Sequence, residues 1–232
     1  MAGRLARILA ACAPLALAAC AGPQSILAPD GPAARIVADL WWAMFIVATL
    51  VLLAVVGLWV HALRRTPRDH DDAARRRIDR RWVIGGGIIL PSVSVAVLLA
   101  FGIPMGHRLL PLPVSGEPPL KIEVIGHQWR WEIRYPTLGI SGVDRIVIPA
   151  GRAVDFHVGS ADVIHGFWIP RLGGKIDAIP GRTNVLRLRA DRPGHYRGQC
   201  AEFCGTGHAH MVLAVEVLDA AAFDAWVETQ QP

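Results

Sequence analysis

Two long runs without a charged side chain constrain this sequence more than any other feature. Leu40 to Val60 spans 21 residues and Trp82 to Ile103 spans 22. As a helix, each run is long enough to cross the ~30 Å hydrocarbon core of a bilayer. Pro91, Ser92 and Ser94 interrupt the second run, but membrane helices tolerate such residues where neighbouring groups satisfy the backbone. The sequence therefore predicts two transmembrane helices, over residues 40–60 and 82–103.

The charges around these runs predict how the helices are oriented. Segment 64–81 carries eight arginines against four aspartates, a net charge of +4, whereas residues 117–232 carry a net charge of −1. By the positive-inside rule, loop 64–81 is expected in the cytoplasm and both flanking parts across the membrane. Tryptophans near the helix ends suit an aromatic belt: Trp41, Trp42, Trp59 and Trp82. Because one loop holds the positive surplus, the sequence predicts no nucleic-acid partner.

The first twenty residues have the composition of an export signal. Arg4 and Arg7 precede an apolar stretch, Ile8 to Ala19, that is too short to span a bilayer. The stretch closes with the letters LAAC, which resemble the processing site of bacterial lipoproteins and make Cys20 a candidate for lipidation. An ordinary cleavable signal with an incidental cysteine is the alternative. Both interpretations place the residues that follow outside the cytoplasm.

Residues 117–232 have a period-two pattern that is typical of β-strands. Apolar and polar side chains alternate around residues 129–135, 154–158, 186–189 and 211–217, with Pro/Gly turns between the segments. The pattern predicts an antiparallel sandwich or barrel. Residues 220–227 are expected to form a short closing helix capped by Asp219. We therefore divide the chain into a signal peptide (1–20), a membrane hairpin (21–116) and a periplasmic β domain (117–232).

Segment 199–211 concentrates side chains that bind metals. The twelve residues from 200 to 211 include two thiols, two imidazoles and a thioether, and one more imidazole follows an expected strand upstream. These side chains belong to Cys200, Cys204, His208, His210, Met211 and the upstream His165. Gly205 and Gly207 give the loop the backbone freedom to fold around a centre.

Three interpretations of this cluster are open. A disulfide between Cys200 and Cys204 suits an oxidising compartment but leaves His208 and Met211 unused. A tetrahedral zinc site could use both cysteines, His208 and His165, but thioethers are not usual zinc ligands. Copper favours the combination of thiolate, imidazole and thioether. Two cysteines would allow both sulfurs to bridge two copper ions, an arrangement suited to electron transfer.

The spacing Cys200-x3-Cys204-x3-His208-x2-Met211 resembles the CuA motif of the cytochrome c oxidase subunit II family. Two further stretches resemble the same family: GHQWRW at 126–131, and residues 162–182 with DVIH and KIDAIPGR. The resemblance runs from the first membrane helix to the last strand, and its copper motif is highly specific. It implies a helical hairpin followed by an all-β cupredoxin-like Greek-key barrel.

The resemblance also implies roles for individual residues. The expected copper ligands are His165, Cys200, Glu202 through its backbone carbonyl, Cys204, His208 and Met211. In the family pattern the two cysteines bridge both coppers, His165 and Met211 complete one copper, and His208 and Glu202 complete the other. The Glu202 side chain would reach a magnesium ion shared with subunit I.

Three residues are expected to serve docking and electron entry. Trp129 matches the exposed aromatic through which the family accepts electrons, although its place in the alternating pattern also suits a core position. Asp162 and Asp177 match acidic positions near the docking surface, and capping of its own loop is the alternative for Asp162. Residues 134–139 lack the acidic run of many relatives, and Arg130 lies between two tryptophans, so steering of a basic donor is expected to be weaker.

The predicted protein is subunit II of a terminal respiratory oxidase. It would accept electrons from a c-type cytochrome and pass them to haem in subunit I, for oxygen reduction coupled to proton pumping. The expected partners are subunit I, other oxidase subunits and the lipid bilayer, in a bacterial inner membrane with the β domain in the periplasm. The alternatives are a copper-free quinol oxidase subunit II, which lacks these ligands, and a membrane-tethered copper carrier or assembly protein.

Overall fold

The computed structural model describes residues 22–65, 71–113 and 116–230. The predicted export signal and its candidate lipidation site, Cys20, lie outside the described residues. The chain divides into two compact units: residues 40–109 form one, and the residues before 40 and after 109 form the other.

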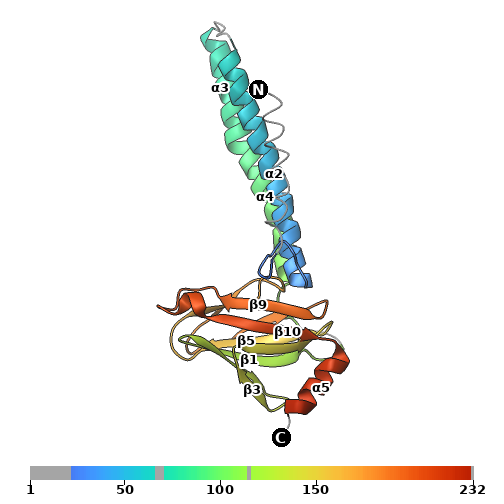
Figure 1. Cartoon of the computed structure of the whole chain (residues 1–232). Coiled ribbons are helices and arrows are strands. Elements are labelled where there is room, and N and C mark those ends of the chain that lie inside the picture. The colour runs from blue at the N-terminus through green and yellow to red at the C-terminus, as the bar shows by residue number, and fades with distance from the viewer. Residues whose placement is uncertain (1–21, 66–70, 114–115, 231–232) are drawn as a thin grey trace, which may run out of the picture. The chain divides into compact units, whose positions relative to one another are not determined.

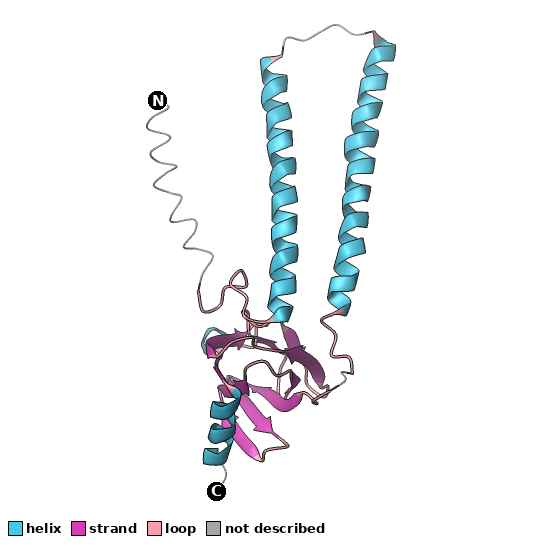
Figure 2. Ribbon diagram, turned by 90° about the vertical axis from the view of Figure 1, so that its right-hand side faces the viewer, coloured by secondary structure: helices cyan, strands magenta, loops and turns pink. Residues whose placement is uncertain are grey.

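The first unit consists of two long helices that run in opposite directions (Figure 2). The first is α2 (Pro32–Arg64), whose residues before 40 belong to the other unit. The second is a continuous helix made of α3 (Asp72–Ile84), a π-helical turn η1 (Gly85–Ile89) and α4 (Leu90–His107). Both are long and apolar enough to cross a membrane by length and composition. Their apolar side chains are largely exposed, as suits segments whose surroundings are hydrocarbon rather than water. The two predicted helices at 40–60 and 82–103 lie within these elements.

The segment predicted as a loop, 64–81, differs from the prediction because most of it is helical. Helix α3 begins at Asp72, where the Asp71 carboxylate accepts a hydrogen bond from the backbone N–H of Ala74 at 2.6 Å. Such a cap satisfies one of the otherwise unpaired donors of the first turn, and arginine and alanine are good helix formers. The arginine-rich stretch therefore extends the second helix instead of connecting the two.

The wide turn η1 coincides with three consecutive glycines and a following proline. The N–H of Leu90 bonds to the carbonyl of Gly85, five residues back. Pro91 has no N–H, and a proline ring crowds the carbonyl four residues earlier, which here belongs to Gly87. A π-turn widens the helix at this point, so the helix continues past the proline without a break.

The second unit is built around two five-stranded sheets (Figure 1). One has the order β3-β2-β1-β5-β8 and the other the order β4-β10-β9-β6-β7. The first five strands are β1 (Leu120–His127), β2 (Arg130–Tyr135), β3 (Ile140–Val143), β4 (Arg145–Pro149) and β5 (Val154–Ser160). The other five are β6 (His165–Trp168), β7 (Ile176–Ala178), β8 (Asn184–Leu188), β9 (Gly194–Cys200) and β10 (Val212–Leu218).

The pairing of the strands is mixed, whereas the alternating pattern had suggested an antiparallel arrangement. β1 pairs in parallel with β5, and β10 pairs in parallel with β4. The members of each pair are far apart in sequence, so no hairpin turn forces them to be antiparallel. The two sheets, with connections that cross between them, have the cupredoxin-like architecture that the sequence implied.

The period-two segments predict the core well. On β2 the side chains of Trp131, Ile133 and Tyr135 are buried, and the residues between them face outward. β5 and β10 alternate in the same way. The predicted closing helix is α5 (Ala220–Gln230), whose first turn is capped by Asp219 accepting from the N–H of Ala222 at 2.8 Å. Phe223 is the residue that α5 buries in the core.

Residues 22–39 pack against the sheets and belong to the same unit. The carboxylate of Asp30 is 4% exposed and forms ion pairs with Arg171 and Arg192. The next residue, Gly31, lies so close to the carbonyl of Arg189 that a Cβ would be 2.4 Å from it. These contacts of Asp30 and Gly31 join residues that are far apart in the sequence. No local sequence pattern could therefore have predicted them.

Candidate metal centre

The loop between β9 and β10 holds most of the predicted site. Cys200 is the last residue of β9, and Met211 precedes β10, with their backbones joined by a bond from Cys200 N–H to the Met211 carbonyl at 2.9 Å. Antiparallel pairing of the two strands therefore closes the loop at its base. Within the loop, Gly205 has a φ of +118°, a conformation that other residues rarely adopt. His208 follows in the short 3-10 helix η2 (His208–His210).

The sulfur atoms of the two cysteines lie at the middle of the cluster, 3.7 Å apart. Around Cys200 Sγ are His165 Nδ1 at 3.9 Å and the backbone carbonyl of Glu202 at 3.2 Å. Around Cys204 Sγ are His208 Nδ1 at 3.6 Å and Met211 Sδ at 3.8 Å. The structure thus brings together all six residues that the sequence predicted as ligands.

These donor atoms are buried among apolar side chains. His165 is fully buried, and both cysteines and Met211 are almost completely so. Burial raises the pKa of the Cys204 thiol to about 12, and the neighbouring Cys200 thiol acts in the same direction. Without a cation the thiol is therefore neutral at physiological pH. A metal would have to displace its proton, because the thiolate is the form that binds.

Strand β6 supplies His165 from the opposite side of the cluster. Its Nε2 lies 2.8 Å from Oδ1 of Asp162, which leaves Nδ1 directed at Cys200. A carboxylate on the far nitrogen fixes the orientation and tautomer of a ligating imidazole. A Cβ on Gly126 would lie 2.7 Å from the His165 ring, so β1 makes room for the imidazole only because residue 126 is glycine.

Asp162 is held by four hydrogen bonds from its own chain. Its carboxylate accepts from the backbone N–H groups of Gln128 and Val163 as well as from His165, and the Ser160 hydroxyl lies 3.4 Å away. Partial burial works to raise the pKa of Asp162, but these hydrogen bonds outweigh it and lower the pKa to about 2. The sequence suggested either partner docking or loop capping for Asp162. Its contacts are those of a loop cap that also orients His165.

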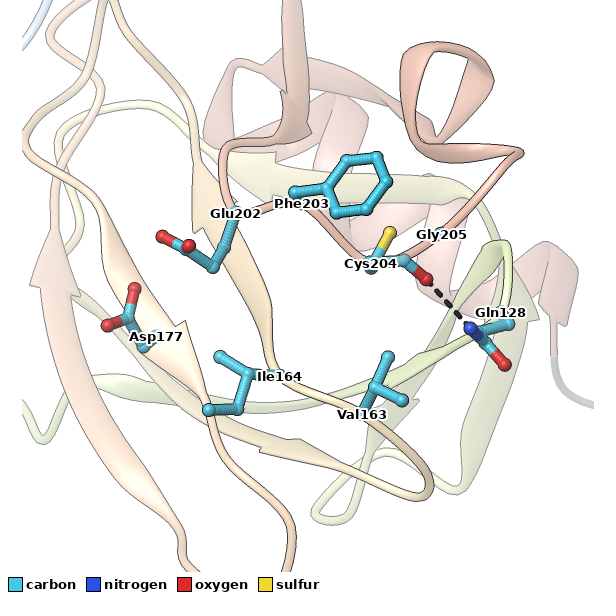
Figure 3. Close-up of a pocket in the computed structure, with 8 residues that line it drawn as sticks. All are labelled: Gln128, Val163, Ile164, Asp177, Glu202, Phe203, Cys204 and Gly205. Carbon is cyan, nitrogen blue, oxygen red and sulfur yellow. Dashed lines mark hydrogen bonds between the residues drawn. The ribbon is translucent and has the colours of Figure 1, made fainter.

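Glu202 contributes to the cluster through its backbone, and its side chain points away from it. The carboxylate is about half exposed and lies 3.4 Å from the ammonium of Lys175. The same ammonium is 4.0 Å from Asp177, so one cation lies between two carboxylates. Figure 3 shows Glu202 and Asp177 together at one end of a surface pocket, with Gln128 and Gly205 at the other end.

Trp129 lies outside the buried stripe of β2, in the turn between β1 and β2. Its side chain is 42% exposed, whereas Trp131 is fully buried. The indole N–H donates to the carbonyl of Cys204 at 3.3 Å, and the ring covers Gly207, where a Cβ would be 2.4 Å from it. An exposed aromatic ring therefore rests directly on the loop that carries the thiols.

Sequence reasoning assigned no role to Gln128 or Gly126, although both lie in the family-like stretch GHQWRW. The Gln128 amide donates to the carbonyl of Cys204 at 2.7 Å and ties the β1–β2 turn to the loop. His127 and His210 are not part of the cluster: His127 pairs with Glu132 on the sheet surface, and His210 is exposed in η2. The resemblance to the family had left both imidazoles out of the ligand set, as loop and strand residues, and their positions agree with this.

The donor set fits the three interpretations of the cluster unequally. Both cysteines are free thiols, which removes the disulfide from this structure. Among the described residues, the ligand atoms that lie within 4.8 Å of one another belong to His165, Cys200 and Cys204, and His208 lies outside that group. A single tetrahedral zinc would need all four together. Two central sulfurs with an imidazole on each side, a thioether and a carbonyl fit copper, and fit two ions better than one.

Comparison with known proteins agrees with this geometry. Residues 140–218 match the model of the family described as cytochrome c oxidase subunit II, periplasmic domain. The chain is 36% identical over 226 residues to cytochrome c oxidase subunit 2 of Alkalihalophilus pseudofirmus, a match that covers 92% of this chain and 65% of that protein. It is 34% identical over 224 residues to cytochrome c oxidase subunit 2 of Triticum aestivum, covering 83% of each.

Two matches among solved structures cover half or more of this chain, with TM-scores below 0.5. The periplasmic domain of subunit II of cytochrome oxidase from Bradyrhizobium japonicum is 38% identical, with a TM-score of 0.47, over 50% of this chain and 96% of that one. A haem–copper terminal oxidase dimer is 26% identical, with a TM-score of 0.42, over 61% and 99%. The chain belongs to the cytochrome c oxidase subunit II family. It spans about two thirds of the length of its Alkalihalophilus relative.

Proposed function

We propose that this chain is the electron-entry subunit of a terminal respiratory oxidase. It takes electrons from a c-type cytochrome at a CuA centre and delivers them to haem in subunit I, where oxygen is reduced to water and protons are pumped. The observation that carries the proposal is the buried pair of free thiols between two imidazoles, with a thioether beside one thiol.

Six residues would hold the two copper ions. Cys200, Cys204, His165, His208 and Met211 would bind through their side chains, and Glu202 would bind through its backbone carbonyl. When bound, the ions supply a site that gains and loses one electron at a time. The protein contributes a dry setting, because His165, the cysteines and Met211 are withdrawn from water, and an imidazole held in place by Asp162. A rigid ligand set keeps reorganisation small as the charge changes.

The exposed ends of the site serve the partners. Trp129 is the entry point for electrons, since its indole combines exposure with a hydrogen bond to the Cys204 carbonyl. On the other side, Glu202 offers its carboxylate to a magnesium ion shared with subunit I. Lys175 now lies next to that carboxylate, so it would have to give way or share it. Asp162 and Asp177 lie next to the docking region.

The same proposal extends to the location of the chain. The helices at 40–60 and 82–103 hold it in a bacterial inner membrane, and the domain from residue 117 lies in the periplasm. Segment 64–81, whose residues from 72 on belong to α3, lies on the cytoplasmic side. Residues 1–20 act as a signal peptide, and Cys20 carries lipid after processing. Other oxidase subunits surround the hairpin.

Two other functions receive less support from the contacts. A copper-free quinol oxidase subunit needs no cluster of thiols and imidazoles, yet all the ligand residues are present. A copper carrier must release its metal, and a buried set drawn from two strands and their loop favours retention.

Mixing the copper-loaded full chain, purified in detergent, with a reduced c-type cytochrome tests the proposed function. Rapid oxidation of the cytochrome, with one electron accepted per pair of coppers, is the expected result. Failure of the copper-loaded chain to accept electrons from any reduced c-type cytochrome or from ascorbate would overturn the proposal. The variant Trp129→Leu should keep its copper and accept electrons more slowly.

A further inference from the structure

Most of the large apolar side chains that remain exposed between residues 116 and 230 lie around the metal cluster. Among described residues 116–230, the large hydrophobic side chains that remain exposed are Trp129, Val143, Val163, Ile164 and Phe203. All but Val143 surround the cluster: Trp129 rests on the thiol loop, and the other three line the same surface pocket as Cys204 (Figure 3). Clustered exposed apolar surface marks a contact with another molecule. We call these four residues the apolar rim.

The carboxylates nearest to the electron-entry side of this rim are already engaged. Glu132 pairs with Arg134 at 2.5 Å and with His127 at 3.0 Å, and these hydrogen bonds lower the pKa of Glu132. Both oxygens of Asp162 accept hydrogen bonds from its own chain. Arg134 neutralises the charge of Glu132, whereas Asp162 keeps its charge but has both oxygens occupied by hydrogen bonds within the chain.

The remaining negative charge lies at the opposite end of the pocket. Figure 3 shows the carboxylates of Glu202 and Asp177 grouped there, away from Gln128. Lys175 lies between the two carboxylates and offsets half of their charge. The end of the pocket that adjoins Trp129 is lined by the uncharged residues Gln128, Val163 and Gly205.

Arg130 is the exception to this pattern of paired charges. It follows Trp129 directly, its side chain is exposed at the start of β2, and no ion pair or hydrogen bond from its guanidinium is present among the described residues. Arg134, four residues further along β2 and also exposed, is already paired with Glu132. Among the described residues beside the exposed indole, the charged group that is left without a hydrogen-bonded partner is therefore positive.

We propose that the electron donor of this chain docks over Trp129 with an apolar, lysine-poor face that carries a carboxylate opposite Arg130. The inference rests on the proposed function and names the chemistry of the partner. A ring of lysines would face Arg130 with no carboxylate free of hydrogen bonds to balance it. An apolar face would cover the rim, and one carboxylate would complement the unpaired guanidinium of Arg130.

Charge near a docking site acts mainly on the association rate and its salt dependence. The probe is one soluble, lysine-rich c-type cytochrome in two forms. One form is native, and in the other the lysines have been converted to carboxylates by succinylation. Each reduced form is mixed with the intact oxidase complex that contains this chain, over a range of ionic strength. The succinylated form should react faster at low salt and slow down as salt is added. The native form should be insensitive to salt or speed up.

Variants assign the effect to the proposed contact. Arg130→Gln should slow the succinylated donor about threefold at low salt, whereas Arg130→Lys should preserve the rate. Arg152→Gln is the matched control, because Arg152 lies in the turn beside the start of β1, at the opposite end of that strand from His127 and Trp129. It should change neither rate.

A native donor that reacts faster, slows steeply with salt and gains speed in Arg130→Gln would overturn the docking inference. The reduction of the centre by ascorbate and its copper content, measured on the same samples, keep the two claims apart. If both are normal, the proposed function stands and only the nature of the donor face is wrong. If copper is absent, both fail together.

Discussion

The metal cluster and the apolar rim around it are adjacent, yet they follow opposite rules of burial. Inside, polar ligand groups are hidden: His165 is 0% exposed and Cys204 is 3% exposed. On the rim, apolar groups are exposed to solvent: Phe203 is 77% exposed and Trp129 is 42% exposed. Each arrangement would be unfavourable in an isolated soluble domain, since buried donors need partners and exposed apolar groups need cover. A metal ion bound among the ligand groups and a protein partner that covers the rim would relieve both conditions.

Removing one thiol should have the largest effect on the metal cluster while leaving the apolar rim unchanged. Cys204→Ser replaces the thiolate that lies next to Cys200, His208 and Met211 with a hydroxyl, which is a poor copper ligand. We expect loss of the dinuclear centre and of electron entry, with the rim unchanged. Metal analysis and the visible spectrum measure this. Thr206→Ala, an exposed change in the same loop, should keep both coppers; equal copper contents in the two variants would contradict the account.

A methyl group behind His165 tests how tightly the interior is built. Gly126→Ala places a Cβ 2.7 Å from the imidazole, so the ring or the strand must shift. We expect about 2 kcal/mol of destabilisation and a copper affinity lower by about tenfold. Gly142→Ala on β3 meets no atom within 4 Å and serves as the control. Chemical denaturation and copper titration compare the pair, and indistinguishable variants would show that His165 is not held as described.

Asp162 lies between the two regions, and its effect should depend on pH. Because its pKa is lowered to about 2, its ionised form stabilises the folded state fully above the unfolded value of 3.8, and this contribution is lost as pH falls toward 2. Asp162→Asn should therefore reduce the unfolding free energy of the metal-free chain by about 1 kcal/mol at neutral pH. The difference between variant and parent should shrink on acidification. A difference that grows at low pH would contradict this.

A change on the rim should have the smallest effect and leave the interior intact. Phe203→Ser removes the most exposed apolar side chain of the rim, while Val143→Ser removes an exposed apolar side chain that is not part of it. We expect Phe203→Ser to weaken binding of a partner, either the donor or subunit I, about threefold without altering the copper spectrum. Val143→Ser should have no effect. Measured partner affinities for the two variants provide the comparison, and a weaker spectrum in Phe203→Ser would assign that residue to the interior.

The interior was largely predictable from sequence, and the rim was less so. Cys200, Cys204, His208 and Met211 lie on one short loop, so their spacing alone brought them together, and His165 followed from the resemblance to a known family. The engagement of Asp162 by Gln128 and His165 joins three separate segments, and no local pattern encodes it. For the same reason the exposure of Trp129 could not be read from the alternation on β2, which begins one residue later.

The fold shows the same division between local and long-range information. Apolar runs predicted both long helices, and period-two patterns predicted the strands, because each depends on neighbours within a few residues. The parallel pairing of β1 with β5 and the anchor of Asp30 on Arg171 and Arg192 depend on contacts across the chain. The second helix begins at Asp72, which is a local feature, but the high charge of segment 64–81 led to the prediction of a loop.

Electron paramagnetic resonance of the full chain, purified in detergent and loaded with copper, tests the central claim most directly. We expect an intensely coloured oxidised centre with one unpaired electron, whose resonance signal is split by equal coupling to two copper nuclei. We also expect Cys204→Ser to abolish this signal. A signal from one copper nucleus alone, or a colourless chain that binds zinc or forms a disulfide between Cys200 and Cys204, would contradict the claim.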